Sequence, residues 1–78
     1  MKQRQPAGLD PALAALGARI ATRRKSKGYT QEDLAHEADI ALRSLQTAER
    51  GTLNPSYLTL RKIAAGLETS VGRLLADL

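Results

Sequence analysis

The side chains best suited to chemistry in this 78-residue chain are five polar groups that stand close together: Arg43, Ser44, Gln46, Thr47 and Arg50. If this stretch is helical, each residue turns by about 100°, which places the five on the outer side and on both flanks of a helix, away from Leu45. Arginine can pair with guanine, glutamine with adenine, and serine or threonine with several bases. The face is therefore suited to reading DNA, although an ordinary solvated helix surface is also polar.

The sequence offers no comparable group for catalysis or metal binding. It contains no Cys, and His36 is its only His. We expect His36 to face outward beside Glu37 on a helix. Glu32 and Asp33 stand at the expected start of that helix, where carboxylates interact favourably with the helix dipole. We therefore predict that the protein is not an enzyme and binds no metal and no cofactor.

The apolar pattern places the polar face on the third of five short helices. Leu9, Leu13, Leu16 and Ile20 recur at helical spacing. Asp10-Pro11 is a helix start, and Gly28 follows the expected last residue, near position 27. Further helices are predicted over residues 31–38, 41–50, 57–66 and 71–78, three of them capped by Thr30, Ser56 and Ser70.

No stretch alternates apolar and polar residues with a period of two, so we predict no strand. The fold class is all-α: a compact bundle of five short helices with a central helix-turn-helix. We expect a single domain over residues 9–78, preceded by a flexible basic tail over residues 1–8. No apolar run is long enough to span a membrane and no secretory signal is present, so we predict a cytoplasmic location.

Positive charge is concentrated at the start of the chain. The chain carries 12 Lys and Arg against 8 Asp and Glu, a net charge of +4. Residues 1–28 hold seven of the basic residues and one acidic residue. Such a field attracts nucleic acid or acidic lipid, but it can also serve only solubility. We expect the basic groups of residues 1–28 to flank the helix over residues 41–50.

A set of motifs spans most of the chain. They are Leu16-Gly17-x-Arg19-Ile20, Arg24, Gly28, Thr30-Gln31-Glu32-Asp33-Leu34-Ala35, Ile40, Leu45, Glu49-Arg50-Gly51, Asn54-Pro55-Ser56, Leu60, Ala64 and Leu67-x-x-Ser70-x-x-x-Leu74-Leu75. With these motifs the sequence resembles the phage-repressor-like helix-turn-helix family, of the Cro and xenobiotic-response-element type, over about residues 16–78. The resemblance implies a lambda-repressor-like DNA-binding domain, and a bacterial or phage regulator of transcription that binds double-stranded DNA.

The resemblance also implies roles for individual positions. Arg24 and Glu49 match a partly buried ion pair that links the first helix to the third. Residues 51–56 match a loop that holds a phosphate. Together with the outward face of the third helix, the expected DNA-binding residues are Gln31, Leu42, Arg43, Ser44, Gln46, Thr47, Arg50 and Asn54.

Three positions depart from the family pattern. Asp39 and Glu68 stand where the family usually has Gly. Asp tolerates left-handed backbone geometry better than most residues, so we expect strain at Asp39 and no loss of the fold. Leu42 is apolar at a position that usually reads a base, although it could touch a thymine methyl group. The target sequence therefore cannot be inferred from relatives.

One short helix reads too few bases for useful specificity. We therefore predict a homodimer on a near-palindromic operator, with two reading helices about 34 Å apart. Its interface is predicted from apolar residues at the chain end: Val71, Leu74, Leu75 and Leu78. The main alternative is a protein-interaction module of the same fold, such as an antitoxin or adaptor subunit. Binding of the basic first helix to a membrane surface is a weaker alternative, because its apolar face is needed for the core.

Overall fold

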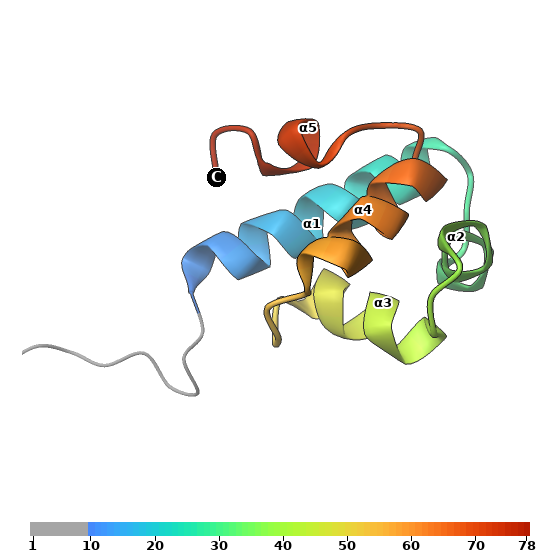
Figure 1. The fold of residues 1–78 in the computed structure, drawn as a ribbon, viewed down its shortest axis with the longest axis horizontal. Coiled ribbons are helices and arrows are strands. Elements are labelled where there is room, and N and C mark those ends of the chain that lie inside the picture. Colours follow the sequence, from blue (N-terminus) through green and yellow to red (C-terminus); the bar gives the residue numbers. More distant parts are fainter. Residues whose placement is uncertain (1–9) are drawn as a thin grey trace, which may run out of the picture.

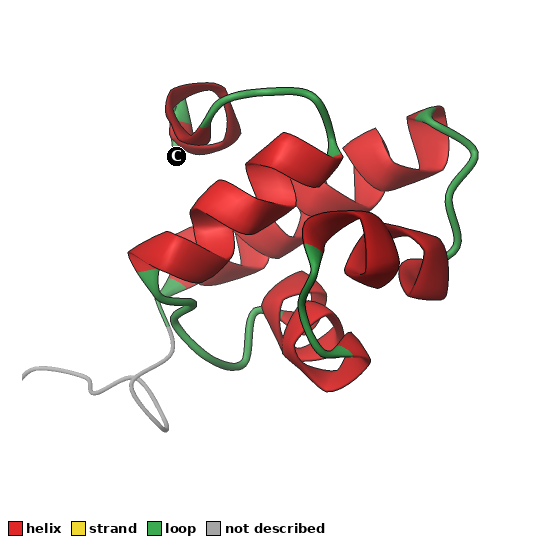
Figure 2. Cartoon of the chain, turned by 45° about the vertical axis from the view of Figure 1, so that its right-hand side comes forward, coloured by secondary structure: helices red, strands yellow, loops and turns green. Residues whose placement is uncertain are grey.

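The computed structural model describes residues 10–78, so Leu9 and the predicted tail over residues 1–8 lie outside it. The described part contains five helices and no strand, which confirms the all-α prediction (Figures 1 and 2). The helices are α1 (Pro11–Ser26), α2 (Gln31–Ala38), α3 (Leu42–Arg50), α4 (Tyr57–Gly66) and α5 (Val71–Leu75).

Helix α1 runs across the middle of the molecule, with α3 on one side of it and α5 on the other (Figure 1). Helix α2 packs against both α3 and α4, and α5 packs against α1 and α4. The helix-turn-helix unit, α2 and α3, is thus held from behind by α1 and α4. This arrangement leaves the outer side of α3 uncovered within the described chain.

Side-chain caps explain where most helices begin. The side chains of Asp10, Thr30, Ser56 and Ser70 each accept a backbone N–H in the first turn of α1, α2, α4 and α5. Helix α3 starts after Ala41, one residue later than predicted, and its cap makes no side-chain bond. Helix α5 ends at Leu75, three residues before the predicted end.

The turn between α2 and α3 is made by a non-glycine residue in left-handed geometry. Asp39 has φ 56° and ψ 51°, and its N–H donates to the carbonyl oxygens of Ala35 and His36. The expected strain at Asp39 is therefore present, because an L side chain in this region is disfavoured by roughly 1–2 kcal/mol. Glu68, the second departure from the family's glycines, has φ 59°.

Each helix contributes one large, fully buried side chain to a single core: Ile20, Leu34, Leu45, Ile63 and Leu74. Leu74 was predicted to lie in a dimer interface, but it is 0% exposed within its own chain. It therefore offers no surface to a second copy. Leu75 and Leu78, at 40% and 42% exposed, remain accessible, and Val71 is partly buried against the core.

Helix α1 approaches α3 closely at Gly17. A Cβ at this position would lie 2.5 Å from the carbonyl oxygen of Ala48 and still closer to that of Glu49. Only a residue without a side chain lets the two helix backbones meet at this distance. Gly17 therefore sets how deeply α3 is seated, and thus how its outer face is presented.

Candidate nucleic-acid interface

Helix α3 has a buried side and an exposed side, as its sequence predicts. Leu45 and Ala48 are buried in the core. The predicted reading residues lie on the other side: Arg43, Ser44 and Arg50 are exposed, and Gln46 and Thr47 are half-buried. The helix therefore presents a row of hydrogen-bonding groups along one uncovered face.

Two shallow recesses border this face. The first, which we call the loop recess, lies between α3 and the segment that follows it, and it is lined by Ser44, Thr47, Ala48, Leu53, Asn54, Pro55 and Thr59. The second, between the start of α2 and the second half of α3, is lined by Gln31, Gln46 and Arg50. Six of the eight predicted DNA-binding residues are thus brought together in two groups, and Leu42 and Arg43 line neither.

Leu42 differs from the other predicted reading residues, because part of its side chain packs against the core. It therefore anchors the first turn of α3 as well as forming part of the surface. Arg43, the next residue, is exposed and carries a positive charge at the start of the reading face.

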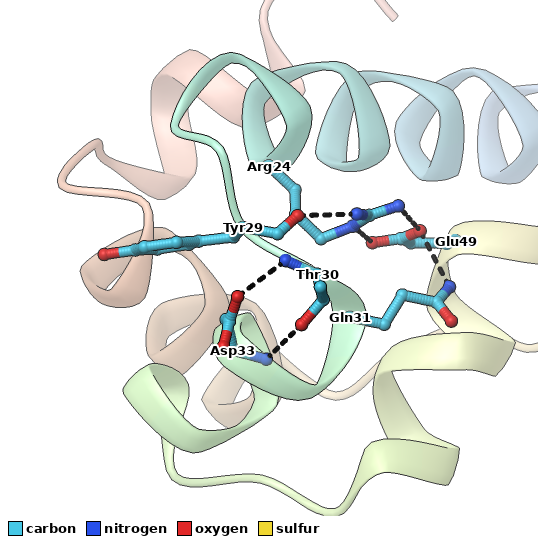
Figure 3. A network of polar contacts seen from close by, with 6 residues as sticks. All are labelled: Arg24, Tyr29, Thr30, Gln31, Asp33 and Glu49. Atoms are coloured by element: carbon cyan, nitrogen blue, oxygen red, sulfur yellow. Dashed lines mark hydrogen bonds and ion pairs between the residues drawn. The ribbon is translucent and has the colours of Figure 1, made fainter.

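A polar network joins the first three helices behind this face (Figure 3). The Nε of Arg24 on α1 donates to Oε2 of Glu49 on α3 over 2.7 Å, and its Nη2 donates to Oε1 over 3.1 Å. The Nη1 of Arg24 donates to the carbonyl oxygen of Tyr29 over 2.9 Å. The two charged side chains are only 10% and 7% exposed. The hydrogen bond to Glu49 raises the pKa of Arg24, so the guanidinium stays charged.

Gln31 extends the network from α2 to α3. Its Nε2 donates to Oε1 of Glu49 over 3.0 Å, which fixes the amide at the edge of the reading face (Figure 3). A carboxamide has two N–H donors and an acceptor oxygen, so the other N–H and the oxygen remain for another partner. The predicted ion pair and a predicted DNA-binding residue therefore belong to one connected structure.

The predicted location of the positive charge needs correction. Arg19 does not flank α3: its Nη1 donates to the carbonyl oxygen of Leu74, over 3.1 Å, and to that of Ala76, at the end of α5. Figure 1 shows α5 on the side of α1 opposite α3. Arg19 thus stabilises the last turn of α5, whose carbonyls have no partner further along the helix.

Two more basic residues of the first 28 are paired internally. Arg24 is held by Glu49, and the Nζ of Lys27 lies 2.6 Å from Oε1 of Glu68. This contact raises the pKa of Lys27 and lowers that of Glu68. Lys2 and Arg4 lie outside the described residues. On the outer face of α3 the positive charge comes from Arg43 and Arg50.

The sequence analysis assigned no individual role to two residues that line the loop recess, namely Leu53 and Thr59. Leu53 is exposed although it is a large apolar residue. Nothing in its spacing distinguishes it from a core leucine, and only the position of the loop beside α3 shows its role in lining the recess.

Residues 10–78 contain no cluster of three or more His, Cys, Asp or Glu side chains arranged to hold a metal ion. None of the helices in this part of the chain combines the length and the apolar character needed to cross a bilayer.

Comparison with known proteins identifies the family. A family model described as helix-turn-helix matches residues 20–74. The chain belongs to this helix-turn-helix family. The match covers α2, α3 and α4 completely, together with the part of α1 that carries Ile20 and Arg24. The assignment confirms the resemblance found in the sequence.

Individual members of the helix-turn-helix family are similar over most of this chain. The HTH-type transcriptional regulator SinR of Bacillus subtilis is 43% identical over 63 residues, which are 80% of this chain and 57% of SinR. This chain therefore spans little more than half the length of that relative. SinR is a transcriptional regulator, which agrees with the prediction of a non-enzymatic protein.

Solved helix-turn-helix structures are similar as well. The restriction-modification controller protein C.AhdI from Aeromonas hydrophila superimposes with a TM-score of 0.80 at 29% identity, covering 83% of this chain and 98% of C.AhdI. SinR, the master regulator for biofilm formation, in complex with DNA, gives a TM-score of 0.73 at 43% identity. That match covers 77% of this chain and 97% of the SinR chain.

Proposed function

We propose that this helix-turn-helix protein regulates transcription by binding a specific double-stranded DNA sequence, with α3 in the major groove. The observation that carries the proposal is the outer face of α3, a helix seated against the core. On this face Arg43 and Arg50 are exposed, and Gln46 and Thr47 are half-buried. Support also comes from the similarity to SinR, whose structure in complex with DNA has the same fold.

Each polar side chain of this face can contact a particular part of the DNA. Arg43 is exposed at the start of α3, where its guanidinium can pair with O6 and N7 of guanine. Gln46 can pair with adenine in the same groove. Arg50, at the end of α3, and Asn54, in the loop that follows it, are both exposed and can donate to the phosphates that border the groove.

Phosphate contacts make the proposed binding sensitive to salt. If 6–10 phosphates are contacted, the affinity falls by roughly 10³–10⁵ between about 50 and 200 mM salt. Within residues 10–78 few cations lie on the α3 face, because Arg19, Arg24 and Lys27 have internal partners. We therefore propose that a second copy of the chain supplies the remaining contacts.

The second copy gives a homodimer on a near-palindromic operator, with the two α3 helices about 34 Å apart. The proposed contact surface includes Leu75 and Leu78, which are exposed, and Val71. Val71 also lines a recess between α4 and α5 together with the exposed Tyr57.

Light scattering should give the mass of two chains, and Leu75→Lys should shift it toward one. A mass of one chain at micromolar concentration with and without operator contradicts the dimer.

A protein-interaction module of the same fold is the second candidate. The observation in its favour is the set of large apolar side chains exposed beyond α3, namely Leu53, Tyr57 and Leu58. The polar and basic face of α3 argues against protein binding as the main activity of this part of the molecule. A cytoplasmic location is compatible with both candidates and is part of the proposal.

The decisive experiment is repeated selection of bound duplexes from random DNA at low salt, followed by sequencing. The proposal predicts one enriched motif with two inverted half-sites, centred about one helical turn apart. No enrichment of any sequence, together with no binding of random duplex, refutes the DNA-binding function and favours the protein-interaction module.

A further inference from the structure

The hydroxyl group of Thr47 is already committed inside its own helix. Its Oγ1 lies 3.1 Å from the carbonyl oxygen of Arg43 and 3.0 Å from that of Ser44, one turn earlier in α3. A threonine hydroxyl has a single hydrogen, and that hydrogen is given to one of these two carbonyls. Thr47 therefore has no donor left for the edge of a base.

Two parts of the Thr47 side chain remain for a partner: the γ-methyl group and the lone pairs of Oγ1. The loop recess that Thr47 lines is partly polar, with Ser44, Asn54 and Thr59, and partly apolar, with Ala48, Leu53 and Pro55. An apolar group that contacts the apolar part of the recess gives up no hydrogen bond with water.

We propose that Thr47 selects thymine by contact between methyl groups, with the 5-methyl of one thymine in each half-site seated against Thr47 at the loop recess. Thymine is the one base that carries a methyl group in the major groove, so this contact is specific for it. The inference rests on the proposed DNA binding and goes beyond it, because it names the base and excludes a hydrogen bond from the Thr47 hydroxyl.

The structure also explains why this position can select a base although it offers no donor. Thr47 lies on the same face as Arg43, four residues earlier, so both side chains point toward the same groove. Arg43 supplies donors for guanine, and Thr47 supplies an apolar surface close by. The combination predicts a half-site in which a guanine and a thymine are both required, a short distance apart.

The test uses the operator obtained by selection and three variants. Thr47→Val keeps the shape and both branches of the side chain but removes the hydroxyl. Thr47→Ser keeps the hydroxyl and removes the methyl. Thr22→Ser makes the same chemical change at an exposed position on α1 and is the matched control. Each is titrated with the operator and with operators in which one thymine at a time is replaced by deoxyuracil in both half-sites.

One buried methyl group corresponds to roughly a four-fold change per half-site, or about 15-fold for two half-sites. We expect Thr47→Val to bind within about two-fold of the wild type and Thr47→Ser to bind roughly 15-fold more weakly. Deoxyuracil at one thymine per half-site should weaken the wild type by the same factor. It should not weaken Thr47→Ser further, because the methyl contact is already lost.

Two results overturn the inference while leaving the proposed function intact. One is a loss of affinity in Thr47→Val as large as that in Thr47→Ser. The other is a wild-type protein for which no thymine responds to deoxyuracil. If the wild type selects no sequence at all, the proposed function and this inference fail together. Thermal unfolding of each variant separates a loss of contact from a loss of folded protein.

Discussion

The guanidinium of Arg24 on α1 donates two hydrogen bonds, of 2.7 Å and 3.1 Å, to the carboxylate of Glu49 on α3. Both side chains are almost fully buried. The pair connects the central helix to the reading helix, and through Glu49 it also holds Gln31 on α2. The three helices that present the reading face therefore share one polar connection in addition to the apolar core.

Breaking this pair from one side should be costly. Arg24→Met leaves the Glu49 carboxylate buried without its partner, and we expect the free energy of unfolding to fall by about 3–5 kcal/mol. A loss of this size is a large part of the total free energy of unfolding, which is roughly 4–12 kcal/mol for a domain of 78 residues. Urea unfolding followed by circular dichroism measures it.

The double variant Arg24→Met with Glu49→Leu is the matched control. Because it removes both charges, we expect it to be more stable than either single variant. If the losses of the two single changes simply add in the double variant, the two side chains do not act as a pair.

The close crossing at Gly17 gives a second prediction. Gly17→Ala places a Cβ against the α3 backbone, and neither helix can move without disturbing the core, so we expect a loss of about 1–3 kcal/mol. Gly72→Ala is the matched control on α5, where the new Cβ would meet only the Ser70 hydroxyl at 3.8 Å. It should be neutral or stabilising by up to about 1 kcal/mol. Equal melting temperatures for the two variants would argue against the close approach.

The left-handed residue between α2 and α3 gives a third prediction. Asp39→Gly relieves the cost of a side chain at φ 56°, so we expect a gain in stability of up to about 1 kcal/mol. The Nζ of Lys62 donates to the Asp39 backbone carbonyl, a contact that glycine keeps. Chemical denaturation measures the change. A variant less stable than the wild type would mean that the Asp39 side chain makes a favourable interaction that outweighs the strain.

A capping interaction provides a prediction on pH. The N–H of Thr30 donates to Oδ2 of Asp33 over 2.9 Å, and this bond holds the pKa of Asp33 below its usual value of 3.8. Because the folded protein binds the proton less tightly than the unfolded chain, the contribution to stability is present above the unfolded pKa. It is lost as the pH falls below about 4 through the folded pKa.

Asp33→Asn isolates this effect. Glu68, whose pKa Lys27 also lowers, responds to acid in the same direction and is present in both proteins. The difference in stability between the wild type and Asp33→Asn should therefore shrink as the pH falls from about 6 to 3. A difference that stays constant over this range would show that Asp33 is not the group responsible.

The sequence predicted the helices well because the signals that start them are local. Asp10, Thr30, Ser56 and Ser70 lie next to the helices that they cap. The predicted end of α5 was wrong, because this end depends on a contact with a distant residue. The apolar residues continue to Leu78, but the chain leaves the helix at Ala76, and Asp77 has φ 60°. The carbonyls at this end are bound by Arg19, a contact that α5 itself does not encode.

In the candidate site, too, the features that depend on local sequence could be predicted, and those that depend on distant contacts could not. The polar side of α3 follows from helical periodicity alone, and so does the burial of Leu45. The distribution of charge does not, because Arg19 and Lys27 find partners in segments that are far away in the sequence. The place of Leu74 in the core could not be separated from a place in an interface, since both require an apolar side chain.

The central claim, that α3 reads bases, is tested most directly by Arg43→Ala, measured on the selected operator and on random duplex. Arg23→Ala on α1 is the control, since it removes the same charge from a surface shared with Arg19. We predict that Arg43→Ala weakens operator binding by about 1–3 kcal/mol, relaxes the preference at one base pair, and weakens random-duplex binding much less. An equal loss on both duplexes, matching that of Arg23→Ala, would contradict base reading by α3.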